Sequence, residues 1–295
     1  MNRIAALRIF PTVALALILA TLGCRSAPDP AFTQLAEARL LADELRVQLA
    51  KASNASDRAV MADTDEESVT FAHEADQAAG SIETKSAALA TRLQSLGYAS
   101  ELHALQEFTD HFGAYRKLDH DVLELAVQNT NLKAQRLSFG PVRETADGFR
   151  DALQAAAGLT LAKDRCRVDA LVARAELAVR EIQILQAPHI AEPDESAMTK
   201  IEKEMAERLG SAREALKSLG AGASAAMTQQ LDAASASLAR FDKLSAELVA
   251  LSRRNSNVRS LALALRRAPQ LVAACDGSLA ILQEALAKEG FSGTR

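Results

Sequence analysis

The feature of this sequence that most constrains its fold is an internal repeat with an offset of 126 residues. Residues 115–131 and 241–257 align without a gap, and an aromatic residue, a lysine, a leucine and two asparagines recur in register. A period of this length indicates a duplicated domain rather than a solenoid of short repeats.

Both copies have the apolar spacing of an amphipathic helix. Apolar side chains recur every three or four residues from Leu102 to Leu125, and again from Leu231 to Leu251. This spacing places them on one face of an α-helix. Aromatic residues make up only 4% of the chain, and no alternating β-branched run competes with the helical pattern. The sequence therefore predicts an all-α protein.

The breaks in the pattern predict how the helices are arranged. We expect eight helices, at 31–58, 65–96, 99–128, 131–160, 163–187, 195–219, 223–254 and 257–288. Their short connections favour antiparallel neighbours, which predicts two tandem up-down-up-down four-helix bundles, 31–160 and 161–289. Few breakers separate the bundles, so we expect them to share a long connecting helix, bent near Pro141 and Gly158. The fourth helix is expected to return towards the N-terminus, so the second bundle would extend past the point where the chain begins. This predicts a rod of two bundles that is tethered near its middle.

The N-terminus has the pattern of a bacterial lipoprotein signal. Two arginines precede a short apolar run that ends at Gly23-Cys24. This pattern predicts a signal peptide over 1–23, a lipid on the Cys24 sulfur that anchors the chain to a membrane, and a leash over 24–30. The resemblance to Gram-negative lipoproteins implies the outer membrane, because Arg25 and not aspartate follows the cysteine. The alternative is an ordinary signal peptide that is cut a few residues later and discards Cys24.

Charge narrows the classes of partner. The formal net charge is −4, and removal of residues 1–23 takes away two arginines and leaves −6. An acidic chain without a basic stripe is a poor nucleic-acid binder, so no nucleic-acid partner is expected. The sequence shows no second apolar span, and we expect 290–295 to be a polar tail. The mature chain is expected to face the periplasm.

The duplicated asparagines are the first candidate site. Asn129, Asn131, Asn255 and Asn257 lie at predicted helix turns, and Lys133 and Arg259 add a cation beside each pair. One interpretation is helix capping, in which the asparagine side chain accepts from free N–H groups of the next helix. The other is a polar surface that binds a ligand or a protein partner.

No metal, cofactor or catalytic centre is expected. His103, Glu107 and His111 share one face of a predicted helix, but they fall partly off its core face, so we expect them to be exposed. The sequence contains no haem-attachment motif, no paired Glu-x-x-His motif and no set of nucleophile and base. It therefore favours a non-enzymatic protein.

Cys166 and Cys275 are the remaining cysteines. In the tandem arrangement they lie at similar heights on neighbouring helices of the second bundle, and an oxidising compartment permits a disulfide. The alternative is two buried free thiols that act as small apolar side chains.

One stretch resembles a known family. Residues 112–118 read Phe-Gly-Ala-Tyr-Arg-Lys-Leu, and Val-Leu-Glu-Leu-Ala at 122–126 and Lys133-Ala134 follow. The series resembles the last two helices of the four-helix-bundle sensor domain of methyl-accepting chemotaxis receptors and related histidine kinases, which carry a proline like Pro141 in the final helix. The resemblance covers 31–160 and, through the duplication, 163–288. It implies an extracytoplasmic sensing or adaptor module and suggests a homodimer.

The sequence shows no counterpart of the receptors' linker and signalling hairpin, and none of their ligand-binding residues matches a position here.

These observations favour a lipid-anchored, non-enzymatic, sensor-like module of the bacterial cell envelope. It would bind a small solute or a membrane receptor through a small shift of packed helices. The alternative is a structural or scaffolding envelope lipoprotein without a small ligand. A cavity lined by convergent polar groups would favour the first function, and a uniformly packed core with an exposed apolar stripe would favour the second.

Overall fold

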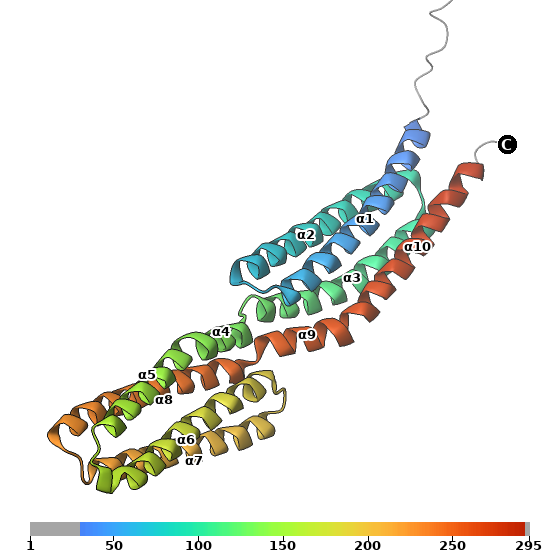
Figure 1. Ribbon diagram of the computed structural model, residues 1–295. Helices are drawn as coiled ribbons and strands as arrows, with labels where there is room; N and C mark the ends of the chain where they lie inside the picture. The colour runs from blue at the N-terminus through green and yellow to red at the C-terminus, as the bar shows by residue number, and fades with distance from the viewer. Residues whose placement is uncertain (1–29, 293–295) are drawn as a thin grey trace, which may run out of the picture.

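The computed structural model describes residues 30–292, which are almost entirely helical and contain no strand (Figure 1). The predicted all-α class is confirmed. The α-helices are α1 (Pro30–Met61), α2 (Asp65–Leu96), α3 (Ala99–Ala126), α4 (Thr130–Leu137), α5 (Arg143–Gly158), α6 (Arg165–Ala191), α7 (Glu195–Gly220), α8 (Ala225–Arg254), α9 (Ser256–Arg266) and α10 (Ala268–Ser292). Two short segments complete the order, the π-helix η1 (Ser138–Val142) and the 3-10 helix η2 (Ala162–Asp164).

The helix ends follow local sequence signals. Thr64, Asp194 and Ser224 each accept a hydrogen bond from a backbone N–H in the first turn of the helix that follows. Gly97 ends α2 with a φ of 74°, a conformation that glycine adopts without the steric cost of a Cβ. Near Pro141, where a bend is expected, the π-helix η1 interrupts the regular α-helix, because proline lacks the N–H that a regular α-helix needs there.

The helices form two groups that lie end to end (Figure 1). We call α1, α2, α3, α9 and α10 the terminal half, and α4 to α8 the central half. One apolar core joins residues such as Leu45, Ile82 and Phe108 with Leu282 of α10. A separate core joins Phe149 of α5 with residues from α6, α7 and α8. Each half therefore takes helices from both repeats.

The predicted tandem grouping into 31–160 and 161–289 is wrong. The fourth helical stretch of the first repeat, α4 and α5, packs chiefly on α8 rather than on α1 to α3. The fourth stretch of the second repeat, α9 and α10, packs chiefly on α3 and α1. The two repeats have thus exchanged their last helices. Their apolar stripes have the same spacing, so either stripe fits either group of three helices.

The shared connecting helix is also absent. α5 ends at Gly158, Leu161 is extended with ψ 147°, and α6 packs beside α5 instead of continuing it. The two halves are joined instead by the passage from α3 to α4 and by the passage from α8 to α9. The fourth helical stretch, α4 and α5, therefore continues away from the N-terminus instead of turning back towards it.

The N-terminal part of the chain joins the rod at one end of the rod, and not near the middle as predicted. The start of α1 and the end of α10 lie together at what we call the near end, and the turns after α5 and α7 form the far end (Figure 1). α1 and α6 contain 32 and 27 residues. At 1.5 Å per residue, they span about 90 Å when placed end to end.

Some predictions concern residues at the chain ends. Cys24, the signal peptide and nearly all of the leash lie outside the described residues. The predicted tail begins as helix, because α10 continues to Ser292, and 293–295 lie outside the described part. Within 30–292, no helix is both long enough and apolar enough to cross a membrane.

The disulfide that the tandem arrangement would permit is absent from the structure. Cys166 and Cys275 are both free, the first exposed and the second buried. They were expected at similar heights on neighbouring helices, but the exchange of helices places Cys166 on α6 of the central half and Cys275 on α10 of the terminal half. The buried-thiol alternative holds for Cys275 alone.

The two thiols are expected to differ strongly in reactivity. Cys275 is buried, so a reagent cannot reach its sulfur. Burial also raises the pKa of the Cys275 thiol to about 12, so almost none of it is thiolate at neutral pH. We expect Cys166 to react with a maleimide about 100-fold faster than Cys275 in the folded protein, measured by mass spectrometry of peptides over time. Equal rates, or a linked pair that reacts only after reduction, would contradict this structure.

Candidate functional site

The four duplicated asparagines meet where the two halves join. We call residues 129–131 and 255–257 the junction. Asn129 and Asn255 precede α4 and α9 with φ values of 49° and 52°, a left-handed conformation that asparagine tolerates better than most residues. This backbone lets each chain segment leave one half and enter the other.

The junction is held by reciprocal hydrogen bonds. The Thr130 N–H donates to Ser256 Oγ (3.1 Å), and the Ser256 N–H donates to Thr130 Oγ1 (3.0 Å). Likewise, the Asn131 N–H donates to Asn257 Oδ1 (3.1 Å), and the Asn257 N–H donates to Asn131 Oδ1 (3.2 Å). The two repeats thus pair as two protomers of an isologous dimer would, with the same contacts in both directions.

These bonds supply caps that the helices lack on their own. Two helix N-termini meet here, and their first N–H groups have no acceptor within their own helix. Neither Asn129 nor Asn255 caps its own helix, so the acceptors come from the other repeat. The expected helix capping is present, because Asn131 and Asn257 accept hydrogen bonds from N–H groups at a helix start. The helix that each one caps belongs to the other repeat. Ligand binding at this position stays a prediction, and most of the polar atoms it would use already have protein partners.

The junction also binds the turn between α6 and α7. Asn131 Nδ2 donates to the Ile190 carbonyl (2.6 Å) and to Asn255 Oδ1 (2.8 Å). Asn255 Nδ2 donates to the Glu192 carbonyl (2.9 Å). On the terminal side, Asn129 Nδ2 is buried without a partner. The asymmetry shows that the central half is fixed to the junction by more side-chain bonds than the terminal half.

The two predicted cations do not share one role. Lys133 Nζ donates to the Gln128 carbonyl (2.8 Å) and lies 3.7 Å from an Asp65 carboxylate oxygen. Its repeat counterpart Arg259 is exposed, and within 30–292 its side chain makes no hydrogen bond or ion pair. Sequence position alone therefore did not define an equivalent cationic site.

A buried histidine near the junction was missed by the sequence analysis. His189 is fully buried in α6. Its Nδ1 lies 2.8 Å from Ser252 Oγ of α8, and its Nε2 lies 2.8 Å from Glu202 Oε1 of α7. Arg253 also donates to Glu202, and this bond is the main cause of the lowered pKa of that carboxyl. The four side chains of the network lie on three helices, so no local motif could have revealed it.

Serine, histidine and glutamate are the residue types of a hydrolase triad, but this geometry does not suit nucleophilic catalysis. Ser252 is fully buried, and its hydroxyl donates to the His189 carbonyl (2.8 Å). A nucleophile must reach a substrate, and this oxygen is enclosed by protein. The arrangement instead ties α6, α7 and α8 together next to the junction.

Asp119 is a buried polar residue in the terminal half. It is 3% exposed, Tyr115 donates to its Oδ1 at 3.4 Å, and its Oδ2 has no partner. Burial raises the pKa of this carboxyl, against a smaller opposing effect from Ser56 and Arg116. The equivalent position in the second repeat is Ser245, which accepts from Gln186 (3.4 Å).

Replacing Asp119 with asparagine is expected to stabilise the protein at pH 7 by about 1–2 kcal/mol, because a neutral amide of the same shape removes the cost of burying a carboxylate. A carboxyl whose pKa is raised on folding contributes most below its unfolded value of 3.8, and that contribution is lost as the pH rises through the folded pKa. The gain should therefore be absent near about pH 3, as measured by chemical denaturation. Exposed Asp121→Asn is the control, and a larger gain at low pH than at pH 7 would contradict the account.

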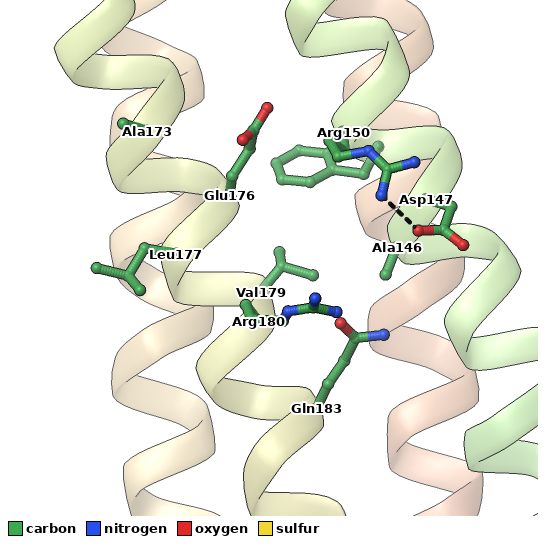
Figure 2. A pocket seen from close by; sticks show the side chains of 10 residues that line it. Ala146, Asp147, Arg150, Ala173, Glu176, Leu177, Val179, Arg180 and Gln183 are labelled. Carbon is green, nitrogen blue, oxygen red and sulfur yellow. Dashed lines mark hydrogen bonds and ion pairs between the residues drawn. The ribbon is translucent and has the colours of Figure 1, made fainter.

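The face between α5 and α6 carries an open groove with a volume of about 370 Å³ (Figure 2). Its floor includes Phe149 and Val179, which are almost fully buried. Arg150 and Arg180 enter it from the two helices, accompanied by Gln183. The groove combines an apolar floor with hydrogen-bond donors, which is the arrangement of small-molecule sites.

The remaining candidate metal residues do not converge. His103 Nε2 lies 3.6 Å from Glu107, while His111 Nδ1 lies 2.8 Å from Ser278 Oγ of α10. Within the described chain, no three side chains of metal-binding type come together.

None of the known protein-family models, curated proteins or solved structures matches the chain.

Proposed function

We propose that the chain is a lipid-anchored, non-enzymatic helical module of the bacterial cell envelope, and that its central half is the sensor-like or partner-binding half. One observation carries the proposal. The chain enters the rod at the near end, six residues after the predicted anchor at Cys24, and the central half lies beyond the junction (Figure 1). An anchor at this end places the central half farthest from the membrane.

Two features support a module that presents a binding surface away from the membrane. The junction bonds connect the two halves directly to each other. Leu159 and Leu161 are exposed at the far end, where they offer apolar area to a partner. The resemblance to chemoreceptor sensor domains favours the same class of function, although here the fourth helix of each repeat lies in the other half.

The anchor is tested by fractionation of the full chain expressed in a Gram-negative host. We expect the protein in the membrane fraction, released by detergent and not by high salt, and Cys24→Ser in the periplasmic fraction. A Cys24→Ser protein that stays in the membrane fraction would contradict lipid anchoring.

The orientation is tested by energy transfer to a membrane-bound acceptor dye in liposomes. A donor on the exposed native Cys166 lies next to the far end, and a donor on Phe32→Cys, in a Cys166→Ser background, lies at the near end. We expect much weaker transfer from the far-end donor. Equal transfer from both positions would show a rod lying along the membrane and would remove the basis for the proposal.

A scaffolding lipoprotein without a small ligand is the second candidate. It is favoured by the cores of both halves, which consist of closely packed apolar side chains. The two candidates differ in whether the groove between α5 and α6 holds a ligand.

A further inference from the structure

Arg180 is a charged group in the α5–α6 groove without a partner in the described part of the chain. Within residues 30–292, its guanidinium makes no hydrogen bond or ion pair, and the same holds for the amide of Gln183, one turn further along α6. The other groove arginine is engaged: Arg150 binds Asp147 (2.8 Å) and Asp151 (3.0 Å). Figure 2 shows Arg180 and Gln183 next to each other in the groove.

The surroundings of Arg180 restrict the ligand that it could bind. Asp147 and Glu176 also line the groove, so the two arginines are balanced by two carboxylates. A dianion such as phosphate would meet this negative charge, whereas a monoanion needs only the one guanidinium that is unpaired. A planar guanidinium can bind both oxygens of a carboxylate at once.

The apolar part of the groove requires a hydrocarbon body. Phe149 and Val179 form the floor, and Leu177 stands 59% exposed at the edge. A volume of about 370 Å³ is at the small end of the range for ligand sites. It fits a molecule with a single ring or a short branched chain.

We propose that the α5–α6 groove binds a small monocarboxylic acid with an apolar body. Arg180 and Gln183 donate to the carboxylate, and Phe149, Val179 and Leu177 contact the hydrocarbon. This inference depends on one part of the proposed function, namely that the central half is the half that binds the ligand. It requires neither the lipid anchor nor a particular orientation of the rod.

The test uses the full chain in a non-ionic detergent and phenylacetate as the probe, followed by calorimetric titration. Phenylacetamide is the matched neutral compound. We expect saturable binding of phenylacetate, and binding of phenylacetamide weaker by about 10-fold or more, because a charge-assisted bond to Arg180 is lost.

Two variants assign the binding to this groove. Arg180→Gln should weaken phenylacetate binding by about 10- to 100-fold. Arg174→Gln is the control, since Arg174 is an α6 arginine outside the groove that binds Glu214 (2.9 Å), and it should bind as the wild type does. Arg180 is exposed, so its replacement leaves the core intact.

Three results would overturn the proposal: no saturable binding of phenylacetate below about 10 mM, equal binding of the acid and the amide, or equal binding by Arg180→Gln and the wild type. None of them bears on fractionation or on energy transfer in liposomes. Failure of the groove and failure of the anchored-module function are therefore separate outcomes.

Discussion

Replacing Asn131 with alanine is expected to lower the free energy of unfolding by about 3–4.5 kcal/mol. The side chain makes three bonds at the junction, to the Ile190 carbonyl, to Asn255 Oδ1 and from the Asn257 N–H. Each lost bond costs about 1–1.5 kcal/mol where its partner stays buried without a replacement. Denaturant unfolding followed by circular dichroism measures the change.

The repeat supplies an internal comparison for this prediction. Asn257→Ala removes two side-chain bonds instead of three, so we expect a loss of about 2–3 kcal/mol. Asn54 is exposed on α1, and Asn54→Ala should change stability by less than about 0.5 kcal/mol. If Asn131→Ala behaved like Asn54→Ala, the junction would not hold the halves together.

Replacing Phe149 with alanine is expected to cost about 3–5 kcal/mol and to loosen helices of the other repeat. Phe149 is 1% exposed and lies in the core that it shares with α6, α7 and α8. Hydrogen exchange should therefore quicken in α6 to α8, and α1 to α3 should keep their protection. In a tandem arrangement the same variant would loosen α1 to α3.

Leu282→Ala is the reciprocal variant. Leu282 of α10 is fully buried in the core of the terminal half, and its truncation should cost about 2–5 kcal/mol. Exchange is expected to quicken in α1 to α3. Loss of protection confined to α6 to α8 would contradict the exchange of helices.

Local features of this fold could be predicted from the sequence. The 3.6-residue period gave the positions of the helices, Gly97 ended α2, and Pro141 bent the fourth stretch. Each of these effects depends on residues a few positions apart. The duplication also drew attention to Asn129, Asn131, Asn255 and Asn257, which the structure places together.

The assignment of the fourth helices could not be predicted in this way. The stripe in α5 and the stripe in α10 have the same period, so each is compatible with either set of three helices. In the structure the fourth helices begin at the junction, where Thr130 and Ser256 cap each other across 126 residues. A capping residue in the sequence indicates that a bond forms, not which helix receives it.

The candidate sites were missed for a similar reason. His189 gains its importance from Ser252 and Glu202, which lie on other helices. Arg180 resembles any exposed helical arginine until α5 is placed beside α6. Both assignments require the tertiary neighbours.

The exchange of fourth helices is tested most directly by cutting the chain between the repeats. A protease site inserted into the exposed α5–α6 turn, at Leu159–Leu161, divides the folded protein into one piece with α1 to α5 and another with α6 to α10. Each piece then contributes helices to both halves, so we predict that the cut protein elutes from a non-denaturing sizing column as a single species that contains both pieces. Separate elution of two folded pieces would contradict the exchange and restore the tandem arrangement.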